Sequence, residues 1–230
     1  MSELVTLDSQ DTHILITMDD GKANALGFDM LDALNAAFDE AEADSKVVVL
    51  AGRPGKFSAG FDLKVMGAGG EPMFRLLRSG AALSQRLLQF PTPVVLAVSG
   101  HALAMGALLC LSADYRIGLR GDFKIGLNEV AIGMTLPWFG IELARYRLEE
   151  TRINAAVGLA QVYTPDEAVE IGYLDEAVEG DALIERSRSL AEQLSALDMA
   201  AHKATKARVR EPFLKALDRA MEKDFVDIAA

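Results

Sequence analysis

The stretch 93–114, PVVLAVSGHALAMGALLCLSAD, has the features best suited to chemistry. A helix is predicted over 101–112, after the break at Ser99-Gly100, and it contains almost no charge. The first turn of a helix leaves backbone N–H groups unpaired, and these donors can hold an oxygen that bears negative charge. Small residues near the start let a ligand approach the backbone. The alternative is a core helix packed through small residues, and this stretch by itself favours that alternative.

Few side chains elsewhere offer acid–base or nucleophilic chemistry. Glu129 follows Gly-Leu-Asn, but an exposed loop carboxylate is the alternative in a chain with 34 acidic residues. Ser58 lies in GKFSAG, which lacks the GxSxG pattern of a hydrolase nucleophile. His101 fits a packing or hydrogen-bonding role better than that of a base. His13 and His202 show no metal-ligand spacing, so the sequence predicts no metal site.

The composition limits the partners and the location. The chain has 230 residues, half of them hydrophobic, which is enough for one sizeable core. Its net charge of −11 argues against nucleic acid as a partner. The single cysteine, Cys110, rules out a disulfide within the chain and fits a reducing cytoplasm. Neither a signal-peptide pattern nor an apolar run of about 18 residues occurs, so we expect a cytoplasmic protein without membrane contact.

Hydrophobic patterns indicate alternating strands and helices. Continuous apolar runs at 47–51 and 94–98 predict strands covered on both faces. Further strands are expected at 4–7, 13–18, 115–118, 123–125 and 173–178. Helices are expected at 28–41, 73–89, 101–112, 141–147, 150–160, 165–171, 181–196 and 199–223, with Pro212 separating the last helices. The alternation predicts an α/β fold with parallel strands.

The C-terminal region, 197–230, is predicted to be helical and to follow a core formed by 1–196. It carries an apolar stripe made of Leu214, Leu217, Met221 and Phe225. Such a stripe either folds back on its own domain or packs on a neighbouring subunit.

Four separated motifs resemble those of the crotonase superfamily, also called the enoyl-CoA hydratase/isomerase family. They are NAL at 24–26 before a helix, FSAGFDL at 57–63, AVSGHA at 97–102, and GLNE at 126–129 followed by Gly133. Their order and spacing match the family over roughly residues 4–200. The resemblance implies a spiral of strand-strand-helix repeats and a C-terminal helical region that builds a homotrimer or a dimer of trimers.

The resemblance also implies a chemistry, which is stabilisation of the enolate of a coenzyme A thioester. Two backbone N–H groups bind the thioester oxygen, and by family position they belong to Phe61 and Met105. Preorganised donors of this kind contribute about 2.7–4 kcal/mol each to the transition state. The family usually has glycine where this chain has Met105, so we expect the methionine side chain to narrow or reshape the pocket. Coenzyme A is part of the substrate, and no separate cofactor is implied.

Family position assigns further contacts to this chain. Those to coenzyme A fall on Lys22, Ala23, Ala25, Ser58, Ala59 and Gly60. Lys22 is a candidate phosphate contact. Leu108, Trp138 and Phe139 are the candidates for the acyl pocket, although core aromatic residues would look the same as Trp138 and Phe139 in the sequence.

The acid–base positions separate the activities within the family. Hydratases use two glutamates that hold a water, and the corresponding positions here are Leu108 and Glu129. The GLNE sequence, Gly133 and the Pro-Trp-Phe cluster are closer to Δ3,Δ2-enoyl-CoA isomerases, which work with one glutamate. We therefore expect Glu129 to move a proton from C2 to C4 of a 3-enoyl-CoA. The alternatives are an enoyl-CoA hydratase, a CoA thioester hydrolase and a non-catalytic acyl-CoA-binding protein.

Overall fold

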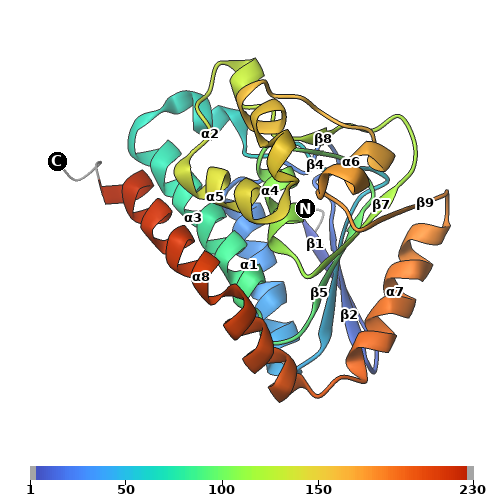
Figure 1. Cartoon of the computed structure of the whole chain (residues 1–230). Helices are drawn as coiled ribbons and strands as arrows, with labels where there is room; N and C mark the ends of the chain where they lie inside the picture. Colours follow the sequence, from blue (N-terminus) through green and yellow to red (C-terminus); the bar gives the residue numbers. More distant parts are fainter. Residues whose placement is uncertain (1–3, 227–230) are drawn as a thin grey trace.

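Two β-sheets organise the chain in a computed structural model that describes residues 4–226 (Figure 1). The larger sheet has the order β1 (Val5–Ser9), β2 (His13–Met18), β3 (Val47–Gly52), β5 (Val94–Val98), β7 (Tyr115–Leu119) and β9 (Glu176–Val178). Its neighbouring strands are parallel, except that β1 runs antiparallel to β2. The smaller sheet is parallel and has the order β4 (Gly55–Ser58), β6 (Gly100–Leu103) and β8 (Ile125–Gly126).

The chain repeats one structural unit, which consists of two strands and a helix. Within each unit the first strand joins the larger sheet, the second joins the smaller sheet, and a helix follows. Thus β3 and β4 precede α2 (Leu63–Ala68) and α3 (Gly70–Gln89), while β5 and β6 precede α4 (Met105–Ser112). The hairpin of β1 and β2 leads into α1 (Phe28–Ala43). The predicted α/β class and the predicted strand-strand-helix repeat are therefore confirmed.

The larger sheet is covered on both faces, which explains its continuous apolar strands. Val48, Leu50 and Leu96 belong to the core that also contains the buried faces of α1, α3 and α4. Val49 and Val95 belong to a second cluster with residues of α7 (Ala182–Ser195), which lies on the opposite face of the sheet (Figure 1). Alternate side chains of each strand therefore enter two different apolar layers.

The buried helix begins later than the sequence predicted. Residues 100–103 form β6, which pairs with β4 and β8, so the helix α4 starts only at Met105. These residues join the smaller sheet, because strand pairing satisfies their backbone groups inside the core. Every residue of α4 is buried, as its lack of charge predicted.

The rest of the chain is mainly helical. It contains 3-10 turns at Val130–Ile132 and Glu150–Arg152, a π-helical turn at Asn154–Gly158, and the helices α5 (Trp138–Arg147), α6 (Pro165–Ile171) and α8 (Met199–Val226). The expected separation at Pro212 is wrong, because α8 continues through the proline. Packing offsets the lost backbone hydrogen bond, since Phe213 stacks on Tyr146 with ring centroids 3.9 Å apart. None of the helices described between residues 4 and 226 has the length and apolar character needed to cross a membrane.

The apolar stripe of α8 folds back on its own chain. Leu217 is fully buried, and Leu214, Met221 and Phe225 pack against the core next to α3 and α5. Figure 1 shows α8, in red, running beside α3. Because the stripe is used within the subunit, it gives no support to assembly. The homotrimer and the dimer of trimers stay predictions that rest on the family resemblance.

A buried ionic cluster fixes α8 to the core. The carboxylate of Asp114, which follows α4, accepts hydrogen bonds from Lys206 at 2.6 Å and Arg210 at 2.9 Å. Arg210 also donates to the carbonyl of Leu88 near the end of α3, at 2.6 Å. Both cationic side chains are more than nine-tenths buried, so each depends on Asp114 for its counter-charge.

We expect Asp114→Ala to lower the free energy of unfolding by about 3–5 kcal/mol, because two buried cations lose their partner. Urea unfolding at neutral pH measures this change. Glu211→Ala is the matched control, since it removes an exposed ion pair with Lys215 from the same helix, and it should cost less than about 1 kcal/mol. Equal losses in the two variants would contradict the role given to the cluster.

Candidate active site

A cavity of about 680 Å³ lies between α2, α3, the start of α4, the segment 128–138 and the end of α8. Its walls are mostly apolar side chains: Phe61, Leu63, Met66, Met73, Phe74, Leu77, Leu108, Ile132, Met134, Leu136, Trp138, Ile141 and Phe225. The polar lining residues are Asn128, Glu129, Thr135 and Asp224. A cavity of this size with few polar groups is suited to an elongated apolar ligand.

The loop after β4 is held rigidly against the start of α4. The hydroxyl of Ser58 donates to the carbonyl of Asn24 at 2.8 Å and accepts the Gly60 N–H at 3.1 Å. Gly60 has φ +96°, and a Cβ there would lie 2.8 Å from the Cβ of Ala104 and 3.3 Å from the Met105 nitrogen. Glycine is therefore required at position 60, both for its backbone conformation and for this close approach.

Two backbone donors come together where these segments meet. Within residues 4–226, no acceptor pairs with the N–H of Phe61 or with that of Met105. Met105 is the first residue of α4, so its N–H lies at the positive end of the helix dipole. Ala104 before it has φ 50°, a strained conformation that turns the chain from β6 into the helix. The pair can hold an oxygen on which negative charge develops.

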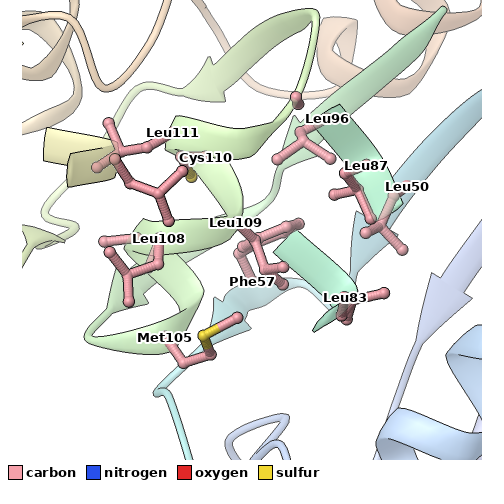
Figure 2. Close-up of a cluster of buried hydrophobic side chains, with 14 of the residues drawn as sticks. Leu50, Phe57, Leu83, Leu87, Leu96, Met105, Leu108, Leu109, Cys110 and Leu111 are labelled. Carbon is pink, nitrogen blue, oxygen red and sulfur yellow. The ribbon is translucent and has the colours of Figure 1, made fainter. Parts of the chain in front are cut away.

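The side chain of Met105 turns into the core and not into the cavity. It is fully buried, and a Cβ on Gly80 of α3 would lie 3.3 Å from its sulfur. Figure 2 shows it among buried apolar side chains, with Leu108 on one side and Phe57 and Leu83 on the other. Since Met105 is absent from the lining, its side chain does not narrow the cavity by direct contact.

Glu129 is a buried carboxyl group at the cavity wall. It is 7% exposed, and its Oε2 atom has no hydrogen-bond partner among the described residues. Its carbonyl accepts the N–H groups of Ile132 at 3.1 Å and Met134 at 2.9 Å, which fixes the turn that carries it. Burial raises the pKa of Glu129 to about 7. A carboxyl group whose pKa is close to the surrounding pH can both remove and return a proton.

Of the other predicted site residues, some line the cavity and others do not. Ala59, Phe61, Leu108 and Trp138 line the cavity together with Glu129. Phe139 is fully buried and is not part of the lining, so it is a core aromatic here.

The predicted coenzyme A contacts gather on neighbouring loops. The Ala59 N–H donates to the Ala23 carbonyl at 3.0 Å, which joins the loop around Lys22 and Ala25 to the Ser58–Gly60 loop. Lys22 is exposed, whereas the Ser58 side chain is fully buried and braces the loop. A buried hydroxyl engaged on both sides is unsuited to act as a nucleophile.

Several lining residues were not predicted. Asn128 and Asp224 supply polar groups, and Phe225 joins them from the end of α8. Asn128 directly precedes Glu129 in the GLNE motif, so the sequence could have indicated that it belongs to the site. The sequence offers no signal for Asp224 and Phe225, because these residues reach the cavity only through the packing of α8.

We expect Glu129→Gln to stabilise the protein increasingly as the pH rises. The folded-state pKa of about 7 lies above the ordinary value of 4.5, so the wild type loses stability as the pH rises through this interval. Glutamine has no charge to bury, and its advantage should grow by about 2 kcal/mol between pH 5.5 and 8.5. Urea unfolding at both pH values measures it, with Glu40→Gln on the exposed face of α1 as the control. An advantage that does not change with pH would contradict the buried, unpartnered state of Glu129.

Comparisons with known proteins identify the family of this chain. The family model described as enoyl-CoA hydratase/isomerase matches residues 8–226. An enoyl-CoA hydratase/isomerase family protein from Pseudomonas syringae is 44% identical and superposes with a TM-score of 0.96, covering 99% of both chains. A Mycobacterium tuberculosis protein, described as an enoyl-CoA isomerase, is 39% identical with a TM-score of 0.93, covering 97% of this chain and 98% of the other. Another structure from this organism, described as a probable enoyl-CoA hydratase, is 38% identical with a TM-score of 0.94, covering 98% of this chain and 96% of the other. A probable enoyl-CoA hydratase of Bacillus subtilis is 30% identical over 183 residues, which are 77% of this chain and 70% of that protein. The chain therefore belongs to the enoyl-CoA hydratase/isomerase family, and its fold is that of the crotonase superfamily.

Proposed function

We propose that the protein is an enoyl-CoA isomerase that converts a 3-enoyl-CoA into a 2-enoyl-CoA. One observation carries the proposal: Glu129 and Leu108 line the same apolar cavity. The family resemblance assigns position 108 to the second acid–base residue of the hydratases. Leucine can neither activate a water nor deliver a proton. A single carboxyl group is sufficient for isomerisation, because the same group removes and returns one proton.

The proposed reaction uses three groups of this chain. Ionised Glu129 takes a proton from C2, and the electron pair of the C–H bond moves into the conjugated system to form a dienolate. The negative charge on the thioester oxygen is stabilised by the N–H groups of Phe61 and Met105. Glu129 then returns the proton to C4, which leaves the double bond between C2 and C3. Substrate and product have the same composition, so no water or redox partner is consumed.

The same surroundings disfavour hydration. Addition of water needs one group to activate the water and a second to protonate the substrate. Leu108 removes the second group, and Leu136 and Ile132 add further apolar surface to the wall near Glu129. A dry wall also raises the pKa of Glu129, which favours return of the proton to carbon.

Binding of the coenzyme A part is proposed at the joined loops around Ala23 and Gly60. In this proposal the residues that bind coenzyme A lie beside the two N–H donors, since Phe61 directly follows Gly60. Lys22, exposed at the edge of this loop, is the proposed phosphate contact. The acyl chain then occupies the apolar cavity.

We expect Glu129→Gln to lose about 10²–10⁴-fold in isomerase turnover, which is the usual cost of removing a general base. Binding of saturated acyl-CoA should change little, because glutamine keeps the shape of the side chain. The wild-type rate should rise with pH through about 7, as Glu129 ionises. Stopped-time assays with 3-enoyl-CoA from pH 5.5 to 8.5 measure both effects. Retention of most of the turnover by Glu129→Gln would exclude it as the base.

Leu108→Glu tests the choice between the two reactions. The variant restores a second carboxyl group, so we expect hydration of 2-enoyl-CoA to increase and isomerisation of 3-enoyl-CoA to fall. Leu108→Met is the control, because it keeps an apolar side chain of similar volume. A wild type that hydrates 2-enoyl-CoA efficiently and leaves 3-enoyl-CoA unchanged would show that the isomerase proposal is wrong.

A further inference from the structure

We propose that Asp224 determines the length of the acyl chain that the cavity accepts. It does so by holding the last turn of α8 across the cavity wall. The three residues of this turn, Lys223, Asp224 and Phe225, are called the C-terminal closure here. The inference rests on the proposed function for the class of ligand, an acyl-CoA thioester.

The strongest contact of the C-terminal closure is a two-pronged hydrogen bond. The two carboxylate oxygens of Asp224 accept the N–H groups of Trp138 and Phe139, each at 2.8 Å. These N–H groups belong to the first turn of α5, whose capping position is Pro137 and has no side-chain acceptor. Asp224 therefore caps α5 from 86 positions further along the chain. Charge-assisted bonds to a helix N-terminus are among the stronger protein hydrogen bonds.

Two neighbouring residues reinforce this contact. The ammonium group of Lys223 lies 4.8 Å from the centre of the Trp138 ring. Arg78 of α3 donates to the Phe225 carbonyl at 3.3 Å, and its guanidinium group lies 5.3 Å from the centre of the Phe225 ring. The closure is thus attached to α5 on one side and to α3 on the other.

Both helices to which the C-terminal closure is attached line the cavity, α3 through Leu77 and α5 through Trp138. Trp138, Asp224 and Phe225 all line it, so this part of the wall is complete only when the closure is in place. Trp138 is also 47% exposed, which means that little protein lies behind this part of the wall. A segment held by a few exposed polar contacts opens more readily than the buried core. Loosening the closure should therefore extend the space for the end of a long acyl chain.

The single tryptophan of the chain is a direct probe of this site. Trp138 touches Lys223, carries one of the two N–H groups bound by Asp224, and lines the cavity, so its emission reports on both closure and ligand. Saturated hexanoyl-CoA and dodecanoyl-CoA are suitable ligands, because they have no double bond and cannot be isomerised. Their dissociation constants are measured by titrating the Trp138 emission.

Asp224→Asn is the test variant, since an amide keeps the shape but can accept only one of the two N–H groups. Asp218→Asn is the matched control: Asp218 lies on the same helix, accepts from Gln85 at 2.6 Å, and is not part of the cavity lining. We expect Asp224→Asn to shift the emission of the free protein to longer wavelength. We also expect it to move the ratio of the two dissociation constants about tenfold in favour of dodecanoyl-CoA, which corresponds to the loss of one charged hydrogen bond. Asp218→Asn should change neither.

An unchanged emission maximum together with an unchanged ratio in Asp224→Asn would overturn the inference. Equal shifts in the two variants would also overturn it, because they would indicate a general effect on α8. The outcome is independent of the proposed reaction: a wild type that binds both thioesters but isomerises no 3-enoyl-CoA contradicts the proposed function alone. A wild type that binds neither thioester would overturn the inference, because the inference assumes that the cavity binds acyl-CoA thioesters.

Discussion

The short helix α4 has to satisfy the backbone groups at both of its ends while it is completely buried, and the rest of the site depends on this constraint. At its start, the N–H of Met105 has no acceptor within residues 4–226, and the thioester oxygen is its proposed partner. At its end, Arg116 donates to the carbonyl of Cys110 at 3.3 Å, and Arg147 donates to the carbonyls of Leu111 and Ala113. Cations at this end complement the negative pole of the helix dipole. The helix can therefore remain in an apolar core with its positive pole directed at the cavity.

The guanidinium of Arg116 is itself balanced by Asp175, with N–O distances of 2.6 and 2.9 Å. Burial and the neighbouring cations lower the pKa of Arg147 to about 10, so the group remains charged at neutral pH. Removal of water from α4 strengthens the field of its N–H groups, because the local dielectric constant is low. The same dryness raises the pKa of Glu129. One physical property, exclusion of water, thus favours both the proposed oxygen-binding donors and the proposed acid–base role of Glu129.

The sequence predicted most of what depends on local pattern. The apolar strands β3 and β5 and the uncharged helix α4 follow from periodicity and charge. The donor position at Met105 is implied by the family resemblance. The start of α4 was misplaced, because Ala102 and Leu103 form a strand through pairing with distant residues. Pro212 was expected to interrupt a helix that tertiary packing keeps continuous.

The outer wall of the cavity could not be predicted either, because it also depends on contacts between distant segments. Asp224 looks like any exposed acidic residue of an amphipathic helix until α8 is placed beside α5. Phe139 and Trp138 are neighbours in the sequence, yet the turn of the helix sends one into the core and the other to the cavity. The direction of the Met105 side chain depends on the space that Gly80 leaves on α3. Each of these features is decided by contacts between segments far apart in the chain.

The central proposal is that Glu129 alone carries the proton from C2 to C4 inside a dry cavity. The most direct measurement uses 3-enoyl-CoA with deuterium at C2, reacted in ordinary water, with the deuterium content at C4 of the product determined by mass spectrometry or NMR. We expect a substantial fraction of the deuterium to appear at C4, because Glu129 returns it before it exchanges with solvent. A product without deuterium at C4, or one that has gained water as a 3-hydroxyacyl-CoA, would contradict the proposal.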